Sequence, residues 1–167
     1  MLLYINMPPK FFNTTPEKTK QQIEAINKHL NFNFKRTTSQ FDRLDAVDVD
    51  KKAVLECKRR TCLASSHPDT LIGINKYNCW KKKYPNYDFY ATFLFEDGLY
   101  YYKFDKDKSI EEQNLFTTKN KKDKDYNEHT NYEKEHINIP IQLLTPLGDY
   151  PKLMPPIQKG VCYLKFD

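Results

Sequence analysis

The sequence predicts an α/β fold with a mixed sheet, in which a helix, three strands, a second helix and a further strand follow one another over residues 15–105. Two kinds of pattern support this order. Apolar residues recur at helical spacing in two segments with helix-start or helix-stop signals, and short alternating runs lie between and after them. The 167 residues are enough for a single domain with one core, which is expected to span residues 1–167.

The first helix has a clear start signal. Thr15 suits the N-cap, Pro16 the first helical position and Glu17 the first turn. The helix is expected to end near residue 30. One buried stripe is predicted from three residues at helical spacing: Ile23, Ile26 and Leu30.

Three strands are expected next, over residues 32–37, 41–49 and 52–60. The first run alternates apolar with polar residues, as a half-buried strand does. Acidic residues at 48 and 50 give the connection between the second and third strands the chemistry of a turn, and the lack of glycine leaves its type open.

Residues 65–69 break the strand pattern and are predicted to start a second helix that runs to about Lys83. Leu71, Ile74 and Trp80 would form its apolar side, and Pro85 would stop it. Gly73 would lie inside this helix at a cost of roughly 1 kcal/mol relative to alanine.

The strongest hairpin signal lies at residues 87–95 and 99–104. Both runs are rich in aromatic residues, and Glu96-Asp97-Gly98 lies between them. An Asp-Gly pair between alternating runs favours a tight primed turn.

The C-terminal part changes in character. Residues 106–136 are dominated by charged and amide side chains and are expected to form a polar insertion or flexible loop. Residues 137–167 contain five prolines and are expected to form a C-terminal extension that packs back on the core, with a short last strand over residues 161–166.

Composition limits the location and the partners. No apolar run is long enough to span a membrane, and residues 1–9 lack the features of a signal peptide. We therefore expect an intracellular (cytoplasmic or nuclear) or virion protein that is not secreted and has no membrane partner. The four cysteines form no C-x-x-C pair and the four histidines no spaced pair, so neither a zinc site nor a disulfide framework is expected.

The net charge of +5 is unevenly distributed, with basic clusters at residues 51–60 and 81–83. Such clusters suit a polyanion. We expect contacts to nucleic acid, most simply DNA, from four side chains in these clusters: Arg59, Arg60, Lys81 and Lys82.

The strands at 42–49 and 53–60 are predicted to form a hairpin with a mixed-charge face. A turn centred on residues 50–51 places Asp45 directly opposite Glu56, close enough for their carboxylates to share one cation. Lys58 points to the same face and Cys57 to the opposite one. A slip of one residue would reverse these relations, so Asp42 stays a reserve ligand.

The two runs FDRLDAV (41–47) and VLECKRR (54–60), with a helix on each side, resemble the PD-(D/E)XK nuclease superfamily. The resemblance covers residues 15–105 and leaves the rest of the C-terminal part without a counterpart. Glu-x-Lys alone occurs by chance in most proteins; the apolar strand leading into it and the upstream Asp make it specific. The resemblance implies a restriction-endonuclease-like or resolvase-like αβββαβ core with a C-terminal extension.

The resemblance also implies roles for individual residues. Asp45, Glu56 and the backbone carbonyl of Cys57 would hold Mg²⁺ or Mn²⁺, and Lys58 would position the attacking water or help deprotonate it. In the family, the first helix often adds an acid and the second helix a basic residue, for which Glu24 and Lys76 are the candidates. For Glu24 an ordinary solvent-side carboxylate is an equal alternative, and for Lys76 a solvated lysine is the preferred one.

The leading hypothesis is therefore a Mg²⁺-dependent deoxyribonuclease of resolvase or repair type, which as a homodimer would cut both strands of a duplex. The alternative is a catalytically silent protein of the same fold that acts as a nucleic-acid-binding or structural module, for example in a virus. A third hypothesis is a small α/β interaction domain in which Glu-x-Lys is accidental.

Overall fold

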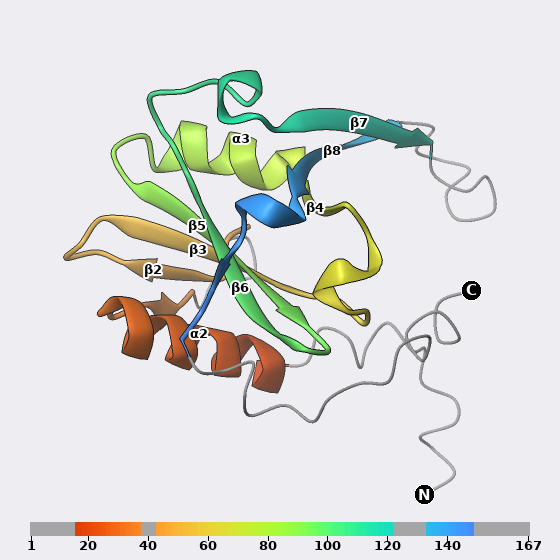
Figure 1. Cartoon of the computed structure of the whole chain (residues 1–167). Coiled ribbons are helices and arrows are strands. Elements are labelled where there is room, and N and C mark those ends of the chain that lie inside the picture. Colours follow the sequence, from red (N-terminus) through yellow and green to blue (C-terminus); the bar gives the residue numbers. More distant parts are fainter. Residues whose placement is uncertain (1–15, 38–42, 122–132, 149–167) are drawn as a thin grey trace, which may run out of the picture.

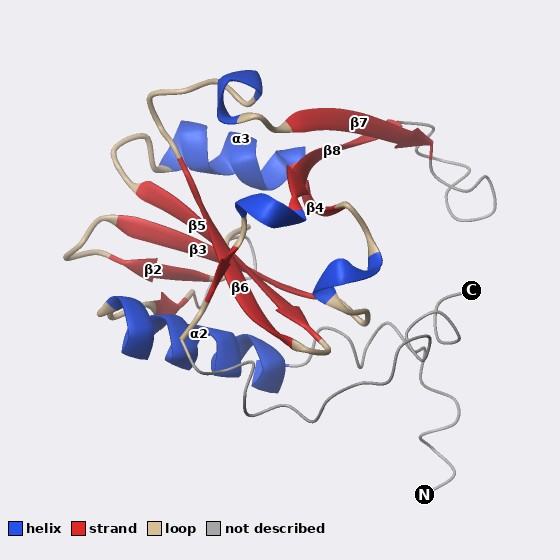
Figure 2. Ribbon diagram, viewed as in Figure 1, coloured by secondary structure: helices blue, strands red, loops and turns tan. Residues whose placement is uncertain are grey.

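The computed structural model describes residues 16–37, 43–121 and 133–148 (Figures 1 and 2). Its helices are α2 (Pro16–Leu30) and α3 (Ile74–Lys83). Its strands, in chain order, are β1 (Lys35–Arg36), β2 (Ala46–Asp48), β3 (Ala53–Arg59), β4 (Asp69–Gly73), β5 (Asp88–Phe95), β6 (Gly98–Phe104), β7 (Phe116–Lys121), β8 (Glu133–Pro140) and β9 (Thr145–Pro146). Short 3₁₀ turns lie at Ala64–Ser66, Glu111–Gln113 and Ile141–Leu143.

The main sheet has the strand order β1-β2-β3-β5-β6-β9. Strands β1, β2 and β3 pair in antiparallel fashion, and β5 runs parallel to β3. The chain crosses from β3 to β5 through β4 and α3, and then turns back as β6. The predicted α/β class with a mixed sheet is confirmed.

The two faces of the main sheet are covered differently (Figure 1). Helix α2 packs on one face, where Ile23 and Ile26 join a buried cluster with Leu55. Helix α3 and a smaller sheet of order β4-β8-β7 lie on the other face, where Trp80 and Ile137 are buried in a second cluster. In the described part of the chain, no helix is both long and apolar enough to cross a membrane.

The start of the second helix was predicted wrongly. Residues Asp69–Gly73 form β4 and pair with β8, which places Ile72 opposite Ile137. Alternate residues Thr70 and Ile72 are buried, as expected for a strand. Gly73 is the extended N-cap of α3 and not an interior helix residue, whereas the predicted end at Lys83 is confirmed.

Two parts of the segment predicted as a polar insertion or flexible loop, residues 106–136, are strands and not flexible loop. Residues 116–121 form β7, and β8 begins at residue 133 and pairs with both β4 and β7. Ile137 and Ile139, just after the predicted loop, are fully buried and fix β8 in the core. After β8 the chain packs back through β9, which pairs with β6.

Several sequence predictions need shorter limits or fall outside the described residues. The strand predicted at 32–37 is reduced to Lys35–Arg36, and the one at 41–49 to Ala46–Asp48. The predicted N-cap Thr15 and the last strand at 161–166 lie outside the described residues.

The predicted hairpin at residues 87–104 is present, but its turn is not of the primed type. Phe95 pairs with Gly98, so Glu96 and Asp97 form the turn, and neither has a positive φ. The turn is held by the preceding loop instead: the Glu96 N–H donates to the Cys62 carbonyl at 3.0 Å, and the Asp97 carboxylate accepts from the Ala64 N–H at 3.0 Å. These hydrogen bonds to the loop hold the turn in place of the positive φ angles that a primed turn would have.

Asp48 closes the hairpin between β2 and β3. Its side chain is buried and accepts the N–H of Asn33 at 2.7 Å and the N–H of Lys51 at 3.0 Å. The Lys52 backbone beside it adopts a positive φ of 50°. Asp48 is thus a structural acid that fixes the far end of the hairpin.

We expect Asp48→Ala to lower the free energy of unfolding by about 2 kcal/mol, because two backbone donors lose their acceptor. Urea unfolding followed by circular dichroism measures the change. The exposed Asp50, two residues away, supplies the control: Asp50→Ala is expected to stay within about 0.5 kcal/mol of the wild type. Equal losses in the two variants would contradict this structural role of Asp48.

Candidate active site

The open end of the β2–β3 hairpin brings the predicted acids near each other. Ala46 pairs with Leu55 and Val47 with Val54, as predicted from a turn centred on residues 50–51. The ladder ends at the Ala46–Leu55 pair. Asp45 lies just before β2, and its N–H donates to the Leu55 carbonyl at 2.9 Å, so the predicted direct pairing of Asp45 with Glu56 is not formed. The Asp45 side chain then reaches across to β3, where its Oδ2 accepts the N–H of Cys57 at 2.7 Å. Asp45 is therefore anchored beside Glu56.

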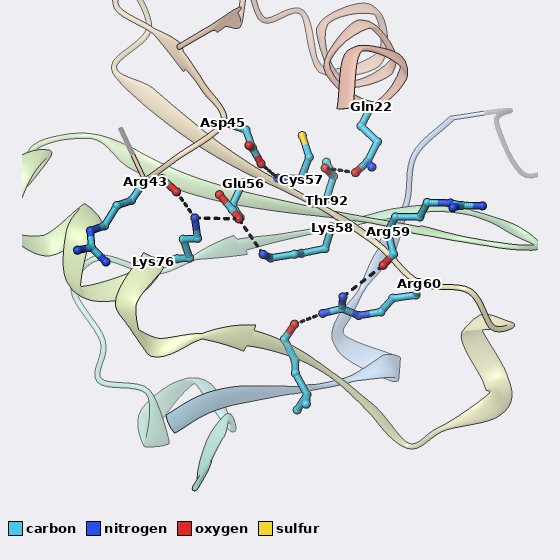
Figure 3. A network of polar contacts seen from close by, with 11 residues as sticks. Gln22, Arg43, Asp45, Glu56, Cys57, Lys58, Arg59, Arg60, Lys76 and Thr92 are labelled. Atoms are coloured by element: carbon cyan, nitrogen blue, oxygen red, sulfur yellow. Dashed lines mark hydrogen bonds and ion pairs between the residues drawn. The ribbon is translucent and has the colours of Figure 1, made fainter. Parts of the chain in front are cut away.

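Glu56 is the central group of the site (Figure 3). It is only 2% exposed, and its Oε1 lies 2.9 Å from Lys58 Nζ and 3.5 Å from Lys76 Nζ. Its other oxygen, Oε2, is buried and has no hydrogen-bond partner among the described residues. Because buried carboxylate oxygens are normally satisfied, this oxygen is the acceptor of the site that is open to a further ligand.

The groups around Glu56 shift its pKa in opposite directions. Burial raises its pKa, the Lys58 ammonium lowers it, the Asp45 carboxylate raises it and Lys76 lowers it. The net result is a pKa of about 7. Glu56 thus changes charge near neutral pH, as groups at functional sites often do.

Two lysines from different elements face Glu56. Lys58 lies on β3, two residues beyond Glu56 and on the same face, and 28% of its side chain is exposed. Lys76 lies in the first turn of α3, and its ammonium donates to the Arg43 carbonyl as well as contacting Glu56. The structure therefore brings Lys76, a candidate from the sequence, into the site. It also adds Arg43, which no feature of the sequence singled out.

The three other predicted ligands do not join this cluster in the described structure. Glu24 is 64% exposed, lies 4.0 Å from Lys20, and belongs to α2 on the opposite face of the sheet, so it is not part of the site. Asp42 lies outside the described residues. The Cys57 side chain packs with the α2 cluster, as expected for the face opposite Glu56, and the role of its backbone carbonyl stays a prediction.

The four residues predicted to contact nucleic acid have different surroundings in the structure. The Arg60 guanidinium turns inward, donates to Thr70 Oγ1 at 3.1 Å and to the Leu71 carbonyl, and so joins β3 to β4. Lys81 donates to the Lys106 carbonyl at 3.1 Å and lies over the Trp80 ring. Arg59 extends away from Arg60 in Figure 3, and Lys82 is exposed on α3.

His136 is a neighbour of the site that the sequence did not indicate. It lies on β8 opposite Gly73. Burial lowers its pKa, and the positive charges of Lys134, Arg60 and Lys58 lower it further. The lowered pKa favours the neutral imidazole at neutral pH.

The donor set fits a hard divalent cation. Mg²⁺ prefers oxygen ligands and keeps several waters, so two carboxylates are enough to hold it. Asp45 and Glu56 supply these, and the buried Oε2 without a partner is the atom that such an ion would satisfy. The described segments contain no group of three or more histidine, cysteine or acidic residues placed to hold a metal ion.

Asp45, Glu56, Lys58 and Lys76 thus form one acid–lysine cluster at the junction of β2, β3 and α3. The chain was compared with protein-family models, with curated proteins and with solved structures, and none of them matches it.

Proposed function

We propose that this protein is a Mg²⁺-dependent nuclease of the PD-(D/E)XK type that hydrolyses phosphodiester bonds in DNA. The observation that carries the proposal is Glu56, a buried carboxylate next to Asp45. One of its oxygens contacts Lys58, and the other has no partner within the described part of the chain. A buried acid in this state is costly unless a cation or proton compensates it.

The strand order supports the same conclusion. The elements α2, β1, β2, β3, α3 and β5 follow the αβββαβ order of a restriction-endonuclease-like core, with β3 and β5 parallel. Strand β4 is inserted before α3, and with β7 and β8 it forms an addition to that core.

Asp45 and Glu56 would hold the metal ion. A bound Mg²⁺ would supply Lewis-acid activation of a water and neutralise charge on the nonbridging phosphate oxygens. The Cys57 N–H fixes the Asp45 carboxylate, and Lys76 and Lys58 hold Glu56, so both acids are oriented before a ligand arrives. Such preorganisation avoids rearrangement during the reaction.

Lys58 has the position needed to act on the substrate. Its ammonium contacts Glu56 and is partly exposed, so it can hold the attacking water and a phosphate oxygen at once. In the reaction, the water oxygen forms a bond to phosphorus and loses a proton to solvent, while the bond to the leaving sugar oxygen breaks and that oxygen takes up a proton from solvent to become a hydroxyl. The fixed positive charge of Lys58 would stabilise the negative charge that builds up in the transition state.

The direct test is cleavage. The purified protein is incubated with supercoiled plasmid, linear duplex and branched DNA in Mg²⁺ or Mn²⁺, with and without EDTA. Cleavage of at least one substrate, abolished by EDTA, is expected. Binding of DNA without cleavage in either metal would refute the nuclease proposal.

The two lysines are expected to differ in importance. Lys58→Ala should lower the single-turnover cleavage rate by about 10²-fold, because it removes the charge nearest to the reacting phosphate. Lys76→Ala should cause a smaller loss, since its ammonium is farther from Glu56, at 3.5 Å compared with 2.9 Å. Lys28→Ala, on the exposed side of α2, is the control and should cleave normally. A full rate in Lys58→Ala would remove this residue from the mechanism.

A catalytically silent nucleic-acid-binding or structural module is the second candidate. The observation in its favour is that two ammonium groups already contact Glu56 Oε1, so the acid is compensated without a metal ion. In that case divalent ions should leave the melting temperature unchanged, whereas a nuclease site should be stabilised by them. Thermal unfolding with and without Mg²⁺ distinguishes the two candidates.

A further inference from the structure

A basic groove lies beside the acid–lysine cluster. It has a volume of about 620 Å³ and lies between Arg43 and α3. The residues at 75, 78, 79 and 82 recur at the spacing of one helical face. The complete lining is Arg43, Asn75, Asn78, Cys79, Lys82 and Lys83. None of these described residues is acidic or aromatic.

The groove is continuous with the cluster through Lys76. The Lys76 ammonium donates to the Arg43 carbonyl and contacts Glu56 Oε1, so Lys76 joins Arg43 of the groove to the cluster. Figure 3 shows the Arg43 side chain extending away from Glu56. A ligand that passes through the cluster can therefore continue along α3.

We infer that this groove binds the sugar-phosphate backbone of a DNA strand on one side of the bond that is cut. The inference rests on the proposed nuclease function and adds the path of the substrate. The guanidinium of Arg43 can bind a phosphate through two parallel hydrogen bonds, and Lys82 offers a second positive charge along the same face. The amides of Asn75 and Asn78 can donate to phosphate oxygens.

The lining also favours the backbone over the bases. Proteins that hold unpaired bases generally stack them on aromatic rings, and the described lining has none. Contacts from Arg, Lys and Asn to phosphates carry no sequence information. Binding through this groove is therefore independent of DNA sequence and weakens as salt is added.

The experiment is a salt titration of DNA binding. Binding of a fluorescein-labelled 20-base-pair duplex to the full chain is followed by anisotropy in EDTA, which prevents cleavage. Wild type is compared with Arg43→Ala, Arg43→Lys, Lys82→Ala and the control Lys28→Ala. Arg43→Ala leaves the backbone carbonyl that Lys76 uses, so it removes the guanidinium alone.

Arg43→Ala and Lys82→Ala are each expected to weaken binding equally on two unrelated sequences. Each should also reduce the slope of log affinity against log salt by about 1. Arg43→Lys should recover part of the affinity, and Lys28→Ala should match wild type. Circular dichroism confirms that each variant is folded.

Results that would overturn the groove proposal differ from results that would overturn the nuclease proposal. Slopes unchanged in Arg43→Ala and Lys82→Ala, or no binding by the wild type, would overturn the groove even if DNA is cut in Mg²⁺. Losses that depend on sequence would overturn the backbone assignment. Groove-dependent binding by a protein that never cuts would support the groove and refute the nuclease.

Discussion

Replacement of Glu56 by glutamine is expected to reduce the rate of DNA cleavage by about 10³-fold while the protein stays folded. Glutamine keeps the volume and one oxygen of the side chain but loses the negative charge that would hold a cation together with Asp45. The loss should appear in single-turnover rates at saturating DNA, because in the proposed mechanism Glu56 acts on the chemical step.

Glu24→Gln is the matched control for this experiment. It makes the same chemical change at an exposed glutamate on α2, on the other face of the sheet. It should cleave at the wild-type rate. A Glu56→Gln protein that still cuts at full rate, or an equal loss in both variants, would show that Glu56 has no special role.

The second large effect concerns stability as a function of pH. The pKa of Glu56 is raised from 4.5 to about 7 in the folded protein, mainly by burial. Between these values the folded protein keeps a proton that the unfolded chain releases. The resulting stabilisation is complete below pH 4.5 and is lost as the pH rises through about 7. A shift of this size corresponds to about 3 kcal/mol.

Glutamine at position 56 does not titrate, so it isolates the effect. We expect the wild type to lose about 3 kcal/mol of unfolding free energy relative to Glu56→Gln between about pH 4.5 and about pH 8 in EDTA. Urea unfolding of both proteins across this range measures the difference. A difference that stays constant with pH, or that changes in the opposite direction, would contradict a raised pKa at Glu56.

The ionisation of Glu56 also determines how the affinity for a metal ion would depend on pH. Only ionised Glu56 can act as a cation ligand, so affinity for Mg²⁺ should rise as the pH passes through about 7. Mg²⁺ should then restore, at higher pH, part of the stability that the ionised site loses.

The local part of the site was predictable from the sequence. The hairpin turn lies among acidic and basic residues at 48–52, and a turn centred there sets which residues face one another. Because side chains alternate along a strand, that register alone places Glu56 and Lys58 on one face and Cys57 on the other. Asp45 departs from this register: its N–H bonds the Leu55 carbonyl and its carboxylate accepts the Cys57 N–H, so its place beside Glu56 comes from these contacts and not from strand pairing.

The second sheet was not predictable in this way. Leu71 and Ile74 are three residues apart, which is helical spacing, yet Ile72 pairs with Ile137 from a strand more than sixty residues later. No local pattern reports a partner at that distance. Because β4 was predicted as helix, nothing in the sequence indicated that Thr70 and Leu71 accept hydrogen bonds from Arg60. Arg60 was predicted to contact nucleic acid.

The contribution of α3 was predictable only in part. A basic residue on the second helix is implied by the resemblance to PD-(D/E)XK nucleases, which points to Lys76. The start of α3 at Ile74 puts Lys76 in the first turn, where it reaches Glu56. The link through the Arg43 carbonyl depends on backbone position, to which the type of side chain gives no clue.

The most direct test of the proposed site is equilibrium binding of Mn²⁺ at about pH 8, measured by the electron paramagnetic resonance signal of the free ion. We predict saturable binding to the wild type and to Glu24→Gln, and a large loss of affinity in Glu56→Gln and Asp45→Asn. Absence of saturable binding to the wild type, or equal binding by all four proteins, would contradict a metal site at Asp45 and Glu56.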